Sequence, residues 1–116
     1  SVTLVVFEAL RDRLTPKEAA DVAAQLPTPL KRLWGANRRP STDVEKLHAA
    51  EFIGRVRQRA ALSDDREAER SVRAVFGALQ LLLGSSDGRT GEAGDVYSQL
   101  PKDLKALWSA ANEAQP

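Results

Sequence analysis

Two pairs of carboxylates recur in the sequence at the same internal spacing. Glu18 precedes Asp21 by three residues, and Glu92 precedes Asp95 by three residues. On a helix, residues three apart lie on one face, so each pair can present two carboxylates to a shared site. Carboxylates brought together could act as a general acid and a general base. The alternative, which the sequence favours, is that they cap helices and line solvated helix faces.

His48 is the single histidine, and the chain has no cysteine. Metal sites in proteins need several converging ligands. Glu45 lies one turn before His48, but no second Glu-x-x-His motif accompanies them, so a di-metal carboxylate site is not indicated. We therefore interpret His48 as a structural or solvated residue, and we expect no metal, nucleotide or flavin cofactor.

A glycine-rich segment spans residues 84–91. It has neither the lysine of a P-loop nor the Gly-x-Gly-x-x-Gly pattern that follows a strand, so a phosphate-binding role is not predicted. We expect this segment to be a mobile connection between two helices. Because the sequence shows no nucleophile, metal set or cofactor loop, we expect a protein that is not an enzyme.

Basic side chains gather between residues 31 and 39, after a short predicted helix that follows a proline turn. This layout loosely resembles a helix-turn-helix, so the group is a candidate contact for an anion, a nucleic acid or a partner. The formal net charge is only +1, however, which is too small an excess for a dedicated nucleic-acid binder and favours a solvated face. The candidate residues are Lys31, Arg32, Arg38 and Arg39.

The elements that must position these residues come from an internal repeat. The stretch 18–34 returns as 92–108, with Glu-x-x-Asp-x-x-x-Gln-Leu-Pro followed by Leu-Lys-x-Leu-Trp in both copies. Neither copy has gained or lost a residue between its glutamate and its tryptophan. We interpret Trp34 and Trp108 as core residues that close each unit, with an exposed partner contact as the alternative.

Capping residues, prolines and apolar periodicity predict an all-α fold, a seven-helix bundle built from two related helical units. Residues 4–7 would also suit a buried strand, but their counterpart lies in a long amphipathic helix, which favours helix. Thr15-Pro16-Lys17-Glu18 predicts a capping box with proline at the first helical position. The expected helices are 2–14, 16–25, 29–34 with Thr28 as the cap and Gly35 as the stop, 43–61 with Thr42 or Asp43 as the cap, a fifth helix capped by residues 63–65 that reaches Leu83, 92–99 and 102–111.

Composition predicts one all-α domain over residues 1–116, with unit one at about 1–35 and unit two at about 43–112. The chain has 42% hydrophobic and 28% charged residues, which is ordinary for a folded protein. No apolar run approaches the roughly 18 residues of a membrane span. The lack of cysteine fits a reducing compartment, so we expect a cytoplasmic protein without a membrane partner.

Several of these segments resemble a bacterial family, domain of unknown function 2267. The residues that carry the resemblance are Glu-Phe-x-x-x-Val at 51–56, Arg-Ala-Val-x-x-x-Leu at 73–79, the two Gln-Leu-Pro segments and the closing Leu-x-x-Leu-Trp. The resemblance implies helical units in tandem. It implies no agreed activity and supplies no catalytic residues to carry over.

The first unit lacks a counterpart of residues 52–69, so we expect it to be incomplete at its N-terminus. Its first turns carry Val2, Leu4, Val5 and Val6, an apolar face that something should cover. We expect an N-terminal helix or a second copy of the chain to do so, with the helix around residues 43–61 folding back as the alternative. These features favour a protein-interaction or self-association module, with a protein partner or a homo-oligomer. The alternative is a weak anion or nucleic-acid binder that uses the basic 31–39 segment.

Overall fold

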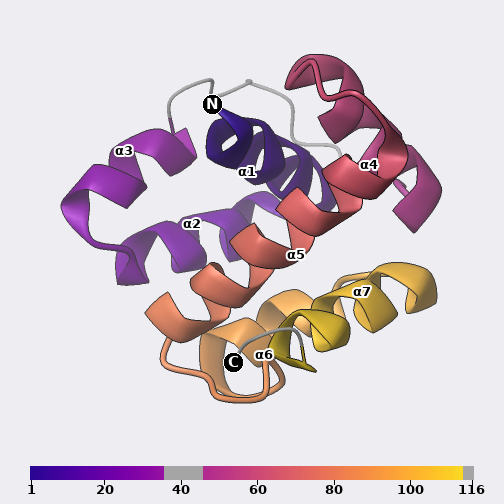
Figure 1. Ribbon diagram of the computed structural model, residues 1–116. Helices are drawn as coiled ribbons and strands as arrows, with labels where there is room; N and C mark the ends of the chain where they lie inside the picture. Colours follow the sequence, from indigo (N-terminus) through magenta and orange to yellow (C-terminus); the bar gives the residue numbers. More distant parts are fainter. Residues whose placement is uncertain (36–45, 114–116) are drawn as a thin grey trace.

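The computed structural model describes residues 1–35 and 46–113, and within them the chain forms seven helices and no strand (Figure 1). The all-α expectation is therefore confirmed. The helices are α1 (Val2–Arg13), α2 (Pro16–Gln25), α3 (Thr28–Gly35), α4 (Ala49–Arg59), α5 (Asp65–Leu82), α6 (Gly91–Ser98) and α7 (Lys102–Glu113).

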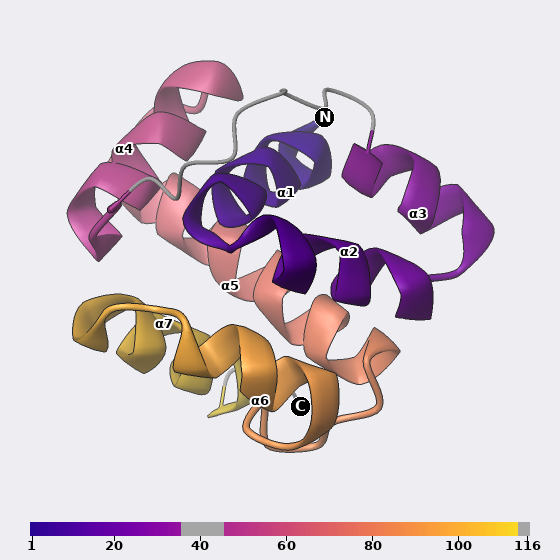
Figure 2. The same cartoon turned by 180° about the vertical axis from the view of Figure 1, so that it is seen from behind.

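The longest helix, α5, is the centre of the arrangement. It packs against α1, α4 and α7, while α2 packs against α3 and α6. Figure 1 shows α5 lying across the near side of the molecule, and Figure 2 shows α1 and α2 in front of it from the opposite side. Helices from the beginning and the end of the chain thus meet where α2 lies beside α6. No helix in the described part of the chain is long and apolar enough to cross a membrane.

Local caps explain where several helices begin. The Thr15 hydroxyl accepts a hydrogen bond from the Glu18 N–H at 3.2 Å, and Pro16 occupies the first turn of α2. The Asp64 carboxylate accepts from the Glu67 N–H at 2.8 Å at the start of α5. Each cap satisfies a backbone donor that has no partner inside its own helix.

The expected start of the fourth helix is wrong. The helix begins at Ala49, with His48 in the cap position, and residues 46–48 are not helical. The Ala49 N–H donates to Asp103 Oδ2 at 3.1 Å, so a side chain of α7 caps α4. Leu47 is buried although it precedes the helix. The expected caps Thr42 and Asp43 lie outside the described residues.

Two aromatic groups anchor the core, as expected for both tryptophans. The rings of Phe7 and Trp34 meet edge to face at 5.1 Å, and those of Phe76 and Trp108 lie 4.9 Å apart. Phe52 extends the second group at 5.7 Å from Phe76. Both indoles are buried, so each N–H needs an acceptor within the protein. Trp34 donates to the Ala19 carbonyl at 2.9 Å, and Trp108 donates to the Gly88 carbonyl at 2.6 Å.

The apolar start of α1 is covered by the chain itself. Val5 and Val6 are buried, Val2 and Leu4 are half-buried, and α1 packs against α4. An ion pair of 3.1 Å between Asp12 and Arg55 joins these two helices. The structure thus shows the alternative, in which α4 folds back against α1.

The connection between α5 and α6, expected to be mobile, is held by its own polar groups. Ser85 is buried, and its hydroxyl accepts a hydrogen bond from the Gly88 N–H at 2.9 Å. The Asp87 carboxylate accepts from the Arg89 N–H at 2.8 Å, and this bond lowers the pKa of Asp87. With the Trp108 indole bound to the Gly88 carbonyl, the loop is fixed to the core.

Candidate functional site: carboxylates between α2 and α6

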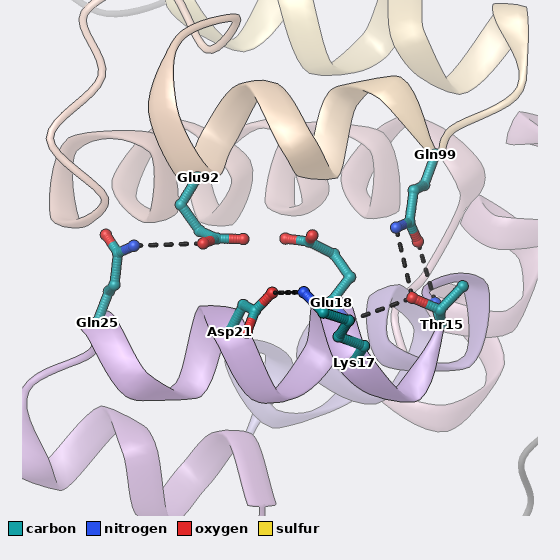
Figure 3. A network of polar contacts seen from close by, with 7 residues as sticks. All are labelled: Thr15, Lys17, Glu18, Asp21, Gln25, Glu92 and Gln99. Carbon is teal, nitrogen blue, oxygen red and sulfur yellow. Dashed lines mark hydrogen bonds and ion pairs between the residues drawn. The ribbon is translucent and has the colours of Figure 1, made fainter.

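Helices α2 and α6 run antiparallel, and a glutamine joins them at each end (Figure 3). At one end, Gln25 Nε2 donates to Glu92 Oε1 at 3.2 Å. At the other end, Gln99 Oε1 accepts from the Thr15 N–H at 3.0 Å. Gln25 and Gln99 occupy the same position in the two sequence copies. The repeated residues therefore face each other across one helix pair.

Between these glutamines lies a buried carboxylate pair. Glu18 is only 6% exposed, and its Oε2 atom has no hydrogen-bond partner. The Oε2 atom of Glu92 is also buried without a partner. Figure 3 shows the two carboxylates pointing toward each other. One oxygen each from Glu18, Glu92 and Asp95 lies within 4.8 Å of the others. We refer to these three residues as the carboxylate cluster.

The predicted capping box forms only in part, and this explains the position of Glu18. In a complete box, the glutamate side chain accepts a hydrogen bond from the N–H of the capping residue. Here the Thr15 N–H donates to Gln99 instead, at 3.0 Å. Because that donor is taken, the Glu18 side chain is not drawn back to its own helix end and turns toward α6.

Burial and the neighbouring Glu92 raise the pKa of Glu18 from 4.5 to about 8, with further contributions from Asp95 and Asp21. Lys17 offers no compensation, because it forms an ion pair of 3.2 Å with Asp21 and is exposed. Two carboxylates confined in one buried place resist being charged together. In the absence of a bound cation, Glu18 therefore holds a proton at neutral pH.

This arrangement corrects the sequence interpretation of the carboxylates. The interpretation as caps and solvated faces is wrong for Glu18, which is buried. The structure brings Glu18, Glu92 and Asp95 together, whereas Asp21 forms an ion pair with Lys17. A protonated glutamate beside carboxylates can exchange its proton with a ligand, or it can release the proton when a cation binds in its place. Both are chemistries of a binding site.

Two of the four basic candidates lie in the described part of the chain. Lys31 and Arg32 are exposed on α3, and Arg38 and Arg39 lie outside the described residues. His48, also exposed, has its Nδ1 atom 3.5 Å from Asp103 Oδ2. Its position at the start of α4 agrees with the structural or solvated role expected from the sequence.

An exposed apolar face on α5 was not predicted from the sequence. Leu81 is 65% exposed and Leu82 is 38% exposed. Ala74 and Ala78, one and two turns earlier, are exposed as well. We call these four residues the α5 stripe. A signal was present in the sequence, because helical periodicity that turns Leu79 and Leu83 inward leaves positions 81 and 82 outside.

The fold and its sites define an all-α helical protein with a partly buried carboxylate cluster and an apolar outer face on α5. The chain belongs to the family described as "Uncharacterized conserved protein (DUF2267)", through a match that spans residues 1–107. The resemblance found in the sequence is thereby confirmed. No curated protein matches the chain. Since the family description names no activity, a function has to be argued from the geometry.

Proposed function

We propose that the protein is an interaction module that associates with a second copy of itself through the α5 stripe. Two large apolar side chains on the outer face of one helix, Leu81 at 65% and Leu82 at 38% exposed, carry this proposal. Burying a leucine side chain contributes about 1.5–3 kcal/mol relative to leaving it in water. Leu81 and Leu82 are only partly exposed, so each would gain part of this contribution, and a dimer would cover both leucines of each copy.

The order of side chains along the stripe supports an antiparallel pairing of two α5 helices. The small residues Ala74 and Ala78 precede the large residues Leu81 and Leu82 along the helix. If two copies cross at Ala78, the Leu82 of each copy lies over the partner's Ala74. Large side chains then meet small ones on both sides of the twofold axis, as a symmetric interface requires.

Charge along α5 supports the same orientation. Arg70 is exposed one turn before Ala74, while the last turn of α5 has no basic residue. The C-terminal end of a helix carries a partial negative charge. The exposed carboxylate of Asp87 lies just beyond that end. An antiparallel pair places Arg70 of each copy near the partner's Asp87, whereas a parallel pair places like ends together.

We expect this association to be weak, because a contact limited to one helix from each copy lies at the small end of specific interfaces. A dissociation constant of roughly 10 µM or weaker is consistent with such a contact. The assay therefore has to reach protein concentrations of hundreds of micromolar.

Sedimentation equilibrium on the wild type and two variants tests the proposal. Leu81→Glu places a charge in the stripe, and Ala20→Glu places the same charge at an exposed position of α2. We expect the wild type and Ala20→Glu to form dimers and Leu81→Glu to stay monomeric, with unchanged helical circular dichroism in all three. A wild type that is monomeric at about 500 µM, or a Leu81→Glu variant that dimerises equally well, would refute it.

The alternative function, binding of an anion or a nucleic acid, rests on Lys31 and Arg32 within the described part of the chain. Both are exposed, but they are two charges in a chain whose net charge is +1. We rank this function below self-association. Salt-dependent binding of an oligonucleotide by the wild type, lost in Lys31→Glu, would reverse the order.

We also infer that the chain consists of two related helical units. In support, α1 packs on α3 as α5 packs on α7, and a phenylalanine lies near 5 Å from a tryptophan in both (Phe7–Trp34 at 5.1 Å and Phe76–Trp108 at 4.9 Å). Superposing residues 18–34 on 92–108 in a crystal structure is the test. A poor backbone fit would limit the likeness to the sequence.

A further inference from the structure

The carboxylate cluster brings three acidic groups together with no basic side chain among them. Among residues 1–35 and 46–113, no basic side chain forms an ion pair with Glu18, Glu92 or Asp95. The nearest lysine on α2, Lys17, is bound to Asp21. Glu18 is 6% exposed, and its carboxylate points toward that of Glu92 (Figure 3). A proton on Glu18 satisfies these oxygens when no cation is bound, and a cation that binds the carboxylates would take its place.

We propose that α2 and α6 together form a binding site for one hard divalent cation, with Glu18, Glu92 and Asp95 as its protein ligands. The three carboxylate oxygens lie within 4.8 Å of one another. Ca²⁺ binds oxygen at about 2.3–2.6 Å, so opposite ligands on one ion are about 4.8 Å apart. Small rotations of the side chains are enough to bring all three oxygens to a common centre.

The donor set selects among metals. All three ligands are carboxylates, which suit Ca²⁺, Mg²⁺ and Mn²⁺, and the cluster contains no imidazole or thiolate that would favour zinc or copper. Mg²⁺ requires a tighter octahedron, with oxygen at about 2.0–2.1 Å, and keeps most of its water. We take Ca²⁺ as the first candidate, because it accepts irregular sets of carboxylate and water ligands more readily than Mg²⁺ does. Water would complete the coordination on the exposed side of Asp95.

A cation held in this way would link the two sequence copies. Glu18 comes from the first copy, and Glu92 and Asp95 come from the second, 74 and 77 residues later. The ion would neutralise the charges that oppose the contact of α2 with α6. Its effect is on the stability of this helix pair and does not depend on the α5 stripe, so the two proposals can fail separately.

Thermal unfolding of EDTA-treated protein tests the site at pH 8.5, where fewer protons compete with a cation for the carboxylates. We expect 10 mM CaCl₂ to raise the melting temperature by about 5 °C, from an affinity near 10⁻⁴–10⁻³ M. MgCl₂ should have a smaller effect, and NaCl of equal ionic strength should have none. Isothermal titration with CaCl₂ should give a stoichiometry near one.

Three variants separate a specific site from general charge screening. Glu92→Gln and Asp95→Asn each remove a ligand, and we expect both to lose the stabilisation by CaCl₂. Asp21→Asn removes a nearby carboxylate at the repeat-equivalent position outside the cluster, and it should keep the wild-type response. A wild type whose melting temperature and titration do not respond to CaCl₂ would overturn the proposal. So would a full response in both Glu92→Gln and Asp95→Asn.

Discussion

Replacing Glu18 with glutamine should change how the stability of the protein depends on pH. Glutamine has the shape of a protonated glutamate and can donate a hydrogen bond to Glu92, but it cannot ionise. In the wild type, burial and Glu92 raise the pKa of Glu18 from 4.5 to about 8. A carboxyl whose pKa is raised by folding stabilises the protein fully below its unfolded pKa. That stabilisation is lost as the pH rises from about 4.5 through 8.

The pKa of Glu18 sets the size of this effect. A rise from 4.5 to about 8 corresponds to an upper limit of about 5 kcal/mol, at about 1.4 kcal/mol per pH unit. The actual effect is smaller than this limit, because Glu18 shares its proton with Glu92 and because water can enter beside the partly exposed Glu92. We expect Glu18→Gln to be more stable than the wild type by about 2 kcal/mol at pH 9. In a chain of this length, that is about 8 °C in melting temperature.

Urea unfolding from pH 5 to 9 in the presence of EDTA measures the difference, since EDTA removes any cation that would compete with the proton. The two proteins should converge near pH 5 and separate as the pH rises. Glu69→Gln is the control, because Glu69 is a partly exposed residue of α5 that pairs with Arg73. Its curve should run parallel to that of the wild type. If the Glu18→Gln curve is also parallel to the wild type, Glu18 is not the buried, proton-binding group described above.

Three further substitutions test the packing. Gly54→Ala in α4 should stabilise by about 1 kcal/mol, because a Cβ there meets no atom within 4 Å. Gly94→Ala should destabilise by about 2 kcal/mol, because its Cβ would lie 2.6 Å from the Arg89 carbonyl oxygen. Urea unfolding measures the change in free energy of unfolding for both variants. Changes of the same sign would contradict the packing of α6 on the loop before it. Trp108→Phe should destabilise by about 2–3 kcal/mol and speed hydrogen exchange in residues 85–90, since the Gly88 carbonyl loses its donor. Unchanged exchange there would mean that this hydrogen bond does not hold the loop.

Most of the fold follows from local signals in the sequence. The bounds expected for the first three helices lie within one residue of the observed ones, because Thr15, Pro16 and Pro27 determine their ends through backbone geometry. The start of α4 could not be predicted from local signals, since the N–H of its first residue, Ala49, donates to Asp103, 54 positions away. Only the packing of α7 on α4 brings that carboxylate to the helix end.

The candidate site was predicted only as far as its residue types. The repeat identified Glu18 and Glu92 as equivalent, but nothing local indicated that α2 and α6 would run antiparallel and bring them together. The partial capping box also depends on a tertiary contact. The Thr15 N–H donates to Gln99 and not to Glu18, the residue that would accept from it in a complete box. The exposed position of Leu81 in the α5 stripe could have been predicted from helical periodicity, because Leu81 lies on the opposite side of the helix from Leu79 and Leu83.

Disulfide formation between single cysteines tests most directly whether α5 is a self-association surface. The chain has no cysteine, so Ala78→Cys introduces one thiol at the proposed crossing point, and Ala20→Cys introduces one at an exposed site on α2. A disulfide needs Cα atoms within about 7 Å, which close packing at a small residue provides. Under mild oxidation, we expect Ala78→Cys to form a covalent dimer at least about tenfold faster than Ala20→Cys, a difference of about 1.4 kcal/mol in activation free energy. Equal rates for the two variants would contradict an antiparallel pairing of α5 centred on Ala78.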